Sequence, residues 1–220
     1  MNLGSTLRAF FSTSKPLTGQ PMNSSAAPVL TVYRNGAAFA PPTPPALTNP
    51  GTGQYRVTLA LTAANGFAFA DWVSITADLV LDGAMITALV WQGPIGQAGS
   101  GDDVPFPATI YPLFTLRRPS TGENQNPDNG ASPVLTVYRN GLATLIVPVL
   151  ANPAAGVWIA TLPIDAANGW SMGDELAIWS TGNIDGIPAG GWVIDSYAVS
   201  GGGGGGAGNN LLHVQTLTVA

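Results

Sequence analysis

The sequence contains no cysteine and few charged side chains. Without cysteine, neither a disulfide framework nor a thiolate metal site can form. The absence of cysteine does not distinguish an oxidising from a reducing compartment. Charged residues make up only 9% of the 220 residues, whereas roughly 25% is usual for soluble domains. A surface so poor in charge does little to keep protein molecules apart. We therefore expect a protein that works in contact with other subunits.

Basic side chains are the scarcer of the two kinds of charge. Lys and Arg number 7 against 12 Asp and Glu, which gives a net charge of −5. The basic residues are scattered and form no stripe that could neutralise phosphates, so we expect no binding to nucleic acid. No apolar run approaches the roughly 20 residues of a membrane-spanning helix. The N-terminal segment lacks the basic start and long apolar core of a signal peptide. We expect no contact with a membrane.

The residue patterns of catalytic and cofactor sites are also missing. His213 is the only histidine, and no serine lies in a Gly-x-Ser-x-Gly motif. The glycine run at 201–206 lacks the Lys-Ser or Lys-Thr that follows a phosphate-binding loop, and no Asp-x-Asp-x-Asp run could bind calcium. Adjacent acids such as Asp102 and Asp103 would point to opposite faces of a strand. The sequence predicts a protein that is not an enzyme and holds no cofactor or metal.

What the sequence has in abundance is glycine and proline, with 28 and 19 residues, and short runs of β-branched and aromatic residues. This composition favours all-β structure with many turns. Nine residues, Pro-Val-Leu-Thr-Val-Tyr-Arg-Asn-Gly, occur at Pro28 to Gly36 and again at Pro133 to Gly141. The closing Asn-Gly is the preferred pair of a type I′ hairpin turn, so each copy predicts a strand entering a tight turn. So short a strand cannot bury itself, and its repetition implies two copies of a larger unit.

Further matches follow in the same order after both copies. They pair 54–61 with 157–164, the Ala-Ala-Asn-Gly turn at 63–66 with 166–169, Asp71 with Asp174, and Asp82-Gly83 with Asp185-Gly186. In the first unit we expect strands at Leu3 to Ser14, Tyr55 to Leu61, Trp72 to Leu81 and Met85 to Trp91. The proline-dense stretch Ala37 to Pro50 is expected to be an edge strand or an extended loop. Such short strands with frequent turn signals are typical of an immunoglobulin-like β-sandwich, with a barrel of similar size as the alternative.

We therefore predict an all-β protein of two tandem duplicated immunoglobulin-like β-sandwich domains with a glycine-rich C-terminal tail. The expected divisions are a first unit at 1–95, a linker at 96–107, a second unit at 108–199 and a tail at 200–220. The glycine run of the tail cannot carry a core. Leu211 to Val219 alternates in strand fashion and could add one strand to a sheet, in its own chain or in a neighbouring chain.

Arginine, tryptophan and tail residues are the candidates for interaction. Arg34 and Arg139 precede the two Asn-Gly turns, where they either pair with a carboxylate across an interface or remain on the surface. The 6 tryptophans could form an aromatic platform for sugars. However, Trp158 takes the place of Tyr55 and Trp170 that of Phe67, which favours packing in a core or an interface. The possible interface residues are Arg34, Arg139, Trp91, Trp192, Leu211, Leu212 and Val214.

Several motifs occur in a fixed order along the chain. They are Phe-Ser-Thr-Ser at 11–14, Pro-x-Thr-Gly at 16–19, Val-Tyr-x-Asn-Gly at 32–36, Thr-Ala-Ala-Asn-Gly-Phe at 62–67 and Gly-Asn-Ile-Asp-Gly-Ile-Pro at 182–188. In these motifs the chain resembles a family of tailed-bacteriophage virion structural proteins, whose β-sandwich modules occur in tail, baseplate and fibre-attachment components. The resemblance covers about Leu3 to Ile95 and Ala108 to Val199. The second unit departs from it by reading Leu-Phe-Thr-Leu at 113–116, and the first unit lacks the last motif.

The resemblance implies a non-enzymatic structural protein located in the virion, as a tail, neck or fibre-adaptor component. Its partners would be other virion proteins and copies of itself in a symmetric homo-oligomer, and no catalytic or ligand residues come with the resemblance. Two alternatives remain open. One is a capsid decoration (cement) protein, and the other is a carbohydrate- or surface-binding module that uses exposed tryptophans.

Overall fold

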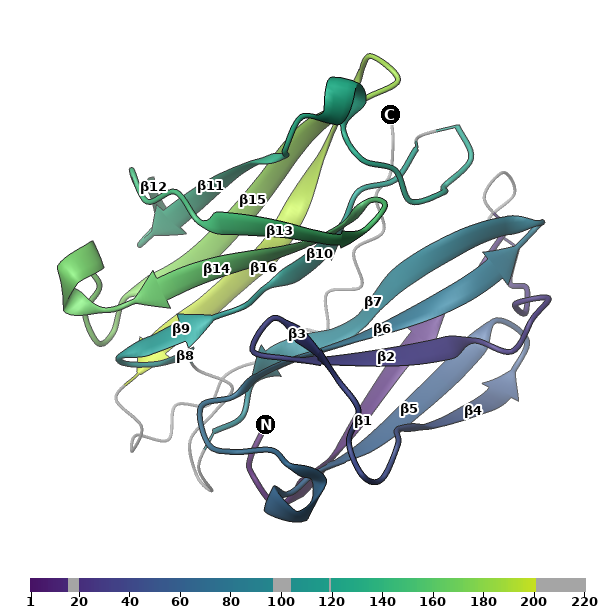
Figure 1. Cartoon of the computed structure of the whole chain (residues 1–220), viewed down its shortest axis with the longest axis horizontal. Coiled ribbons are helices and arrows are strands. Elements are labelled where there is room, and N and C mark those ends of the chain that lie inside the picture. The colour runs from purple at the N-terminus through teal and green to yellow at the C-terminus, as the bar shows by residue number, and fades with distance from the viewer. Residues whose placement is uncertain (16–19, 97–103, 119, 201–220) are drawn as a thin grey trace.

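The computed structural model describes residues 1–15, 20–96, 104–118 and 120–200 (Figure 1). In this part of the chain the elements are β-strands joined by turns and three short 3-10 helices. The chain folds into two tandem immunoglobulin-like β-sandwiches, as the sequence predicts. Each sandwich has two facing sheets, and the two sandwiches lie against each other (Figure 1).

The first unit is built of two antiparallel sheets. One has the order β1-β5-β4 and the other the order β3-β2-β6-β7. The strands are β1 (Ser5–Ser12), β2 (Val29–Arg34), β3 (Ala37–Phe39), β4 (Ala46–Gly51), β5 (Gln54–Leu61), β6 (Trp72–Leu81) and β7 (Ala84–Pro94). The proline-dense stretch contributes β3 and β4, both at sheet edges, where a missing backbone N–H is tolerated.

The second unit repeats this plan with additions at its edges. One sheet has the order β10-β14-β13, with β9 also paired to β14, and the other has the order β12-β11-β15-β16-β8. The strands are β8 (Val104–Pro105), β9 (Ala108–Ile110), β10 (Leu113–Thr115), β11 (Val134–Arg139), β12 (Leu142–Ala143), β13 (Val149–Ala154), β14 (Val157–Ile164), β15 (Glu175–Ile184) and β16 (Ile187–Ser200). β8 lies in the stretch assigned to the linker, yet it pairs in parallel with the end of β16.

The turns follow from the Asn-Gly and Asp-Gly pairs of the sequence. Asn35 and Gly36 have φ values of 51° and 80°, and Asn140 and Gly141 have 52° and 76°. Two successive positive φ angles are the requirement of a type I′ turn, which asparagine and glycine meet at low cost. The β6–β7 and β15–β16 hairpins turn in the same way on their Asp-Gly pairs.

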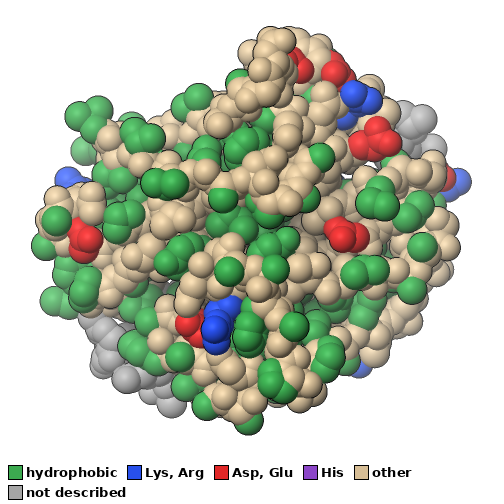
Figure 2. All heavy atoms as spheres, viewed as in Figure 1, with side chains coloured by type: hydrophobic (Ala, Val, Ile, Leu, Met, Phe, Trp, Pro, Cys, Tyr) green, Lys and Arg blue, Asp and Glu red, His purple; other side chains and the backbone are tan. Residues whose placement is uncertain are grey.

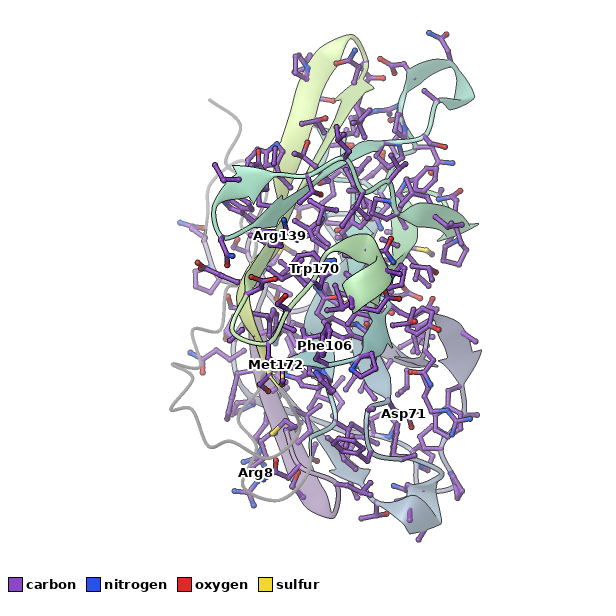
Figure 3. The ribbon with its side chains drawn as sticks, turned by 90° about the vertical axis from the view of Figure 1, so that its left-hand side faces the viewer. Arg8, Asp71, Phe106, Arg139, Trp170 and Met172 are labelled. Atoms are coloured by element: carbon purple, nitrogen blue, oxygen red, sulfur yellow. The ribbon has the colours of Figure 1, made fainter. Side chains whose placement is uncertain are left out.

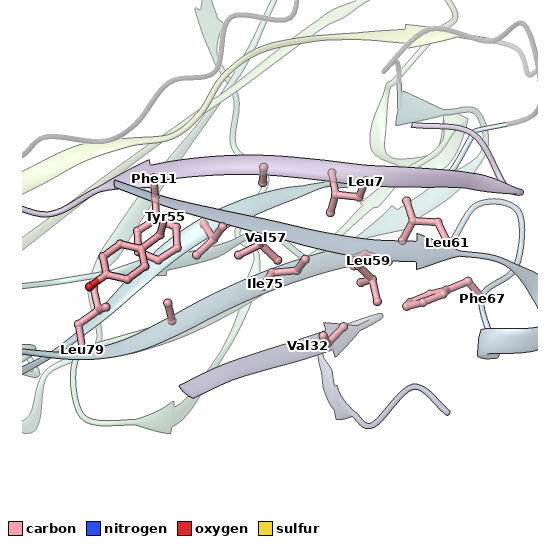
Figure 4. Packing of buried hydrophobic residues seen from close by; sticks show 14 of the residues in the cluster. Leu7, Phe11, Val32, Tyr55, Val57, Leu59, Leu61, Phe67, Ile75 and Leu79 are labelled. Carbon is pink, nitrogen blue, oxygen red and sulfur yellow. The ribbon is translucent and has the colours of Figure 1, made fainter. Parts of the chain in front are cut away.

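The first core forms where the alternating apolar residues of β1 and β5 meet β6. Leu7, Phe11 and Val57 are buried, and they point toward Ile75 of the facing sheet (Figure 4). Phe11 also stacks on Tyr55 with ring centroids 5.0 Å apart. Burial of each such side chain stabilises the fold by roughly 1.5–3 kcal/mol, so period-two alternation fixes which face of each strand turns inward.

The second core contains the tryptophans that the repeat assigned to packing. Trp158 and Trp170, which replace Tyr55 and Phe67, are 6% and 1% exposed. Trp72 belongs to the first unit but packs in this second cluster, edge-on to Tyr197 at 6.0 Å between ring centroids. One apolar cluster therefore crosses from the first unit into the second.

Candidate functional site: the covered and open sheet faces

The asparagine of the repeated nine-residue stretch closes a corner within its own unit. The Asn35 side chain donates to Asp71 Oδ1 at 2.7 Å and accepts from the Trp72 amide at 2.8 Å. In the second unit, Asn140 donates to Asp174 Oδ1 at 2.7 Å and accepts from the Glu175 amide at 2.7 Å. The Asn140 hydrogen bond is the main cause that holds the pKa of the Asp174 carboxyl below its ordinary value. The asparagine thus has a structural role in both units.

The two arginines of this stretch also bind their own unit. Arg34 donates from Nη1 to the Gly66 carbonyl, and its guanidinium lies 4.4 Å from the centroid of the Phe39 ring. Arg139 makes the same bond to the Gly169 carbonyl, beside the buried Trp170 (Figure 3). The sequence left open whether these arginines pair with a carboxylate across an interface or remain on the surface. Within the chain, each one makes an exposed hydrogen bond to a backbone carbonyl at the end of a 3-10 turn.

The first unit turns the outer face of β2, β6 and β7 onto the outer face of β10 and β14. Leu113, Val157 and Ile159 form a buried cluster, and Tyr33 and Leu89 of the first unit pack against it. The hairpin tip takes part, because a Cβ built on Gly36 would lie 3.5 Å from Ile159 Cγ2. Burial, followed by the charge of Asp78, raises the pKa of the Tyr33 hydroxyl.

The contact also buries polar residues on the covered face. Ser74 and Thr76 are 1% and 2% exposed although they point away from the first core. Their alternation with Val73 and Ile75 would place them in solvent if the first unit stood alone. They are buried because the second unit covers this face.

Gln92 of β7 bridges the two sheets of the second unit. Its Oε1 accepts from the Leu113 amide at 2.7 Å, and its Nε2 donates to the Val193 carbonyl at 2.9 Å. Leu113 lies in β10 and Val193 in β16, so one amide side chain satisfies one backbone group on each of two strands. The Gln92 carbonyl accepts from the Tyr197 hydroxyl at 3.2 Å. These three bonds, which we call the Gln92 clasp, fasten the units together.

A second polar contact covers the free edge of β7. The Thr87 amide donates to Asn124 Oδ1 at 3.2 Å, and the Thr87 carbonyl accepts from Arg117 Nη2 at 3.2 Å. Burial lowers the pKa of the Arg117 guanidinium from its ordinary value. The second unit thereby occupies a strand edge that would otherwise invite pairing with another chain.

No strand of the described residues covers the equivalent face of the second unit, which is aromatic. Tyr138, Trp179 and Trp192 lie on neighbouring strands β11, β15 and β16. Trp179 and Trp192 meet edge-on with centroids 5.0 Å apart, and Tyr138 lies 5.8 Å from Trp192. Trp192 is 37% exposed. These three residues, the aromatic cluster, occupy the positions that Tyr33, Thr76 and Leu89 hold in the first unit, in the same register.

A groove of about 860 Å³ continues from the aromatic cluster along β15 and β16. Trp179, Thr181, Gly182 and Gly190 are among the residues that line it. Gly190 stands where the first unit has Thr87, the residue whose edge is covered by Asn124 and Arg117. The groove therefore lies at the place that is filled in the contact between the units.

The outer face of β1 and β5 is the other open face. It presents Arg8, Phe10 and Arg56, of which Phe10 is 53% exposed. Arg8 lies on the outer side of β1 (Figure 3), and Arg56 Nε donates to Thr48 Oγ1 at 3.3 Å. By register, Phe10 and Arg56 hold the places that Leu113 and Ile159 hold on the covered face of the second unit.

The remaining candidates from the sequence are placed as follows. Trp91 is half-buried and packs on the first core, and Trp192 belongs to the aromatic cluster. Leu211, Leu212 and Val214 lie outside the described residues. The sequence patterns did not predict a role for Gln92 or for the apolar outer face of β14. The run Val157-Trp158-Ile159, apolar on both faces where the first unit has Gln54-Tyr55-Arg56, is the signal that could have found them.

Charge is sparse on the surface, where basic and acidic side chains are scattered among apolar and uncharged ones (Figure 2). Within residues 1–15, 20–96, 104–118 and 120–200, no three His, Cys, Asp or Glu side chains come together in a way that could hold a metal ion. Of the helices in the described part of the chain, none has the length and apolar character needed to span a membrane.

No protein-family model matches the chain, and no curated protein sequence matches it. Among solved structures, the I9–I11 tandem of titin is similar over 90% of this chain, with 9% identity and a TM-score of 0.26. This chain spans 61% of that tandem. Titin A168–A169 is similar over 91% of this chain and 93% of its own length, with 11% identity and a TM-score of 0.25. These likenesses concern the fold alone.

Proposed function

We propose that the protein is a non-enzymatic structural component of a tailed-bacteriophage virion, a tail, neck or fibre-adaptor part that assembles through the faces of its sandwiches. The observation that carries the proposal is the fastening of two duplicated sandwiches face to face. The Gln92 clasp and the cluster around Leu113 and Ile159 give a two-sandwich body of fixed geometry. Such a body suits a spacer that holds its neighbours at a set distance.

The surface supports the same proposal. Copies and partners can approach closely because charged residues make up only 9% of the chain and little like-charge repulsion opposes contact. Edge strands such as β4 and β13 leave backbone groups for pairing with partner chains. In a symmetric particle, repetition of one contact multiplies individually weak interfaces. The motif resemblance supplies the virion as the place of assembly.

The experiment is the copy number per particle, measured by quantitative mass spectrometry of purified virions against the major capsid protein. A small number equal to the rotational symmetry of the tail, or a simple multiple of it, is the expected result. A number comparable with that of the capsid protein would make the protein a head decoration instead. Absence from purified particles would contradict the virion proposal altogether.

A carbohydrate-binding module is the second candidate, favoured by the partly exposed aromatic cluster beside a groove. Trp179 and Trp192 are inclined at 78° to each other, so they offer no continuous flat platform for a sugar chain. For that reason we rank this candidate below the structural role. It predicts that Trp192→Ala abolishes binding to an oligosaccharide array while the unfolding midpoint stays that of the unmodified protein.

A further inference from the structure

We propose that the aromatic cluster of one molecule docks on the Arg8, Phe10 and Arg56 face of a second copy of this chain, in a head-to-tail contact. The proposal rests on the proposed function only in treating the protein as an assembly part, and it concerns a contact that purified protein can form without any particle. It names the two surfaces that meet and the direction in which copies add.

The relation between the two units supports this contact. Inside the chain, the outer face of β2, β6 and β7 is covered by the outer face of β10 and β14. The units are duplicates, so each of these faces has a counterpart, and both counterparts are open. Applying the unit-to-unit relation once more places the β1–β5 face of a second copy on the β11–β15–β16 face of the first. The new contact continues the one already present.

The register of the strands makes this correspondence specific. Thr76 pairs with Leu89 in the first unit, and Trp179 pairs with Trp192 in the second, with a bulge following Leu89 and Trp192 in both. Gly36, which lies against Ile159, corresponds to Gly141. Because Ile159 corresponds to Arg56, the relation brings Arg56 of the second copy to the hairpin tip at Gly141, next to Tyr138.

The two open faces differ from their covered counterparts in complementary ways. In the internal contact, Leu89 packs against the aliphatic surface of Leu113, Val157 and Ile159, and Thr76, the strand partner of Leu89, is buried on the same face. In the open pair, the places of Thr76 and Leu89 are taken by indoles, and the places of Leu113 and Ile159 by Phe10 and Arg56. A guanidinium over an indole face and an aromatic pair are both favourable contacts. Arg8 and Arg56 form no ion pair with a carboxylate of the described residues, so both are available for this contact.

The groove beside the aromatic cluster agrees with this occupant. In the internal contact, the Arg117–Asn124 bridge of the second unit covers β7 of the first unit at Thr87. The counterpart of this bridge in the first unit is the Ser14–Pro21 bridge. The counterpart of Thr87 is Gly190, which lines the groove. A second copy would therefore bring its Ser14–Pro21 bridge to the place where the second unit has this groove.

The contact joins two different faces, so it is heterologous and generates rings or filaments rather than closed two-fold dimers. This property gives a sharp test by sedimentation velocity of the full chain over a range of concentrations. Unmodified protein is expected to associate. Trp192→Ala and Arg56→Glu are each expected to lower the association constant by about 30-fold, the effect of losing one hot-spot side chain. Met172→Ala, 66% exposed in the turn before β15 and outside the strands of both faces, is the matched control and should leave the constant unchanged.

Mixing the two variants decides the geometry. Trp192→Ala keeps an intact arginine face, and Arg56→Glu keeps an intact aromatic cluster, so an equimolar mixture should form one-to-one dimers and no longer species. If Arg56→Glu associates like the unmodified protein while Trp192→Ala does not, the aromatic clusters pair with each other and the proposal fails. A mixture that stays monomeric would equally overturn it. Circular dichroism of each variant confirms that folding is intact.

Three further outcomes would also reject the contact. Unmodified protein that stays monomeric at its solubility limit lacks it. Association that appears only after deletion of 201–220 would show that the chain's own tail holds the face. A monomer whose Trp192 binds an oligosaccharide array would make the face a sugar site. None of these outcomes affects the copy-number test, so the contact and the proposed function can fail separately.

Discussion

Gln92→Ala is the substitution that tests the joining of the two units most directly. The Gln92 side chain makes two hydrogen bonds to backbone groups of the second unit, to the Leu113 amide and the Val193 carbonyl. Alanine removes both bonds but leaves the Gln92 carbonyl, and so the bond from Tyr197, in place. The perturbation is therefore confined to the part of the clasp that spans two sheets.

The expected size follows from the burial of the two partners. Leu113 is 0% exposed and Val193 is 5% exposed, so neither backbone group gains easy access to water after the truncation. Each buried polar group without a partner costs roughly 1–3 kcal/mol. Allowing for partial hydration, we expect Gln92→Ala to lower the free energy of unfolding by about 2–4 kcal/mol.

Equilibrium denaturation in urea, followed by tryptophan fluorescence, measures this change. The matched control is Gln125→Ala, which removes an exposed bond of 3.3 Å from Gln125 to Asp185 and should cost less than about 0.5 kcal/mol. We also expect Gln92→Ala to split the transition into two steps, since the units then unfold less cooperatively. Equal effects of the two substitutions, with one shared transition, would refute the role of the clasp.

Three further predictions concern the repeated corners and turns. Asn35→Ala should lower the free energy of unfolding by about 1–3 kcal/mol and Asn140→Ala by less, because Asp71, the partner of Asn35, is 8% exposed whereas the Asn140 corner is on the surface. Thermal unfolding of the two variants compares the losses, and a larger loss for Asn140→Ala would contradict this reasoning. Because the pKa of Asp174 is lowered in the folded protein, its stabilising contribution is present above the unfolded pKa and is lost as the pH falls through the folded pKa. The stability difference between Asp174→Ala and unmodified protein should therefore shrink below about pH 4, and a difference that grows in acid would contradict this prediction. Gly156→Ala places a Cβ against the backbone nitrogen of Gln125, whereas the Cβ of Gly186→Ala meets no atom within 4 Å at a similar positive φ. Urea denaturation should therefore show a much larger loss of stability for Gly156→Ala, and equal losses would argue against the close approach.

Local structure was the part that the sequence could predict. Leu7, Tyr55 and Val57 alternate with polar residues, and period-two alternation fixes which side chains enter the core. The Asn-Gly and Asp-Gly pairs determine the hairpin turns because few other pairs adopt two positive φ angles. The exact repeat carried these assignments from one unit to the other, including the burial of Trp158 and Trp170.

The covered faces could not be predicted in this way. Ser74 and Thr76 have the polarity of solvent-facing residues, and only contact with a distant part of the chain buries them. Arg34 and Arg139 were assigned to a surface or an interface because the carbonyls that they bind lie 32 and 30 residues away. The alternation of apolar and polar residues describes one strand at a time, so it does not predict which sheet of the other unit packs against the outer face of that strand.

The same limit of strand-by-strand patterns explains why the aromatic cluster was not predicted. The repeat positions of Trp158 and Trp170 favoured packing of the tryptophans in a core or an interface, and Trp72, Trp158 and Trp170 are indeed buried. Trp179 and Trp192 replace a threonine and a leucine of the first unit, so the repeat offered no aromatic precedent for them. Only the pairing of β15 with β16 brings their rings together.

The measurement that tests the central claim most directly is a cryo-electron-microscopy reconstruction of purified virions at a resolution that separates strands. The account predicts density for the two fastened sandwiches at symmetric positions in the tail or neck, with the Tyr138, Trp179 and Trp192 face covered by the Arg8 and Arg56 face of the next copy. Particles without this density, or with that aromatic face open to solvent in every copy, would contradict it.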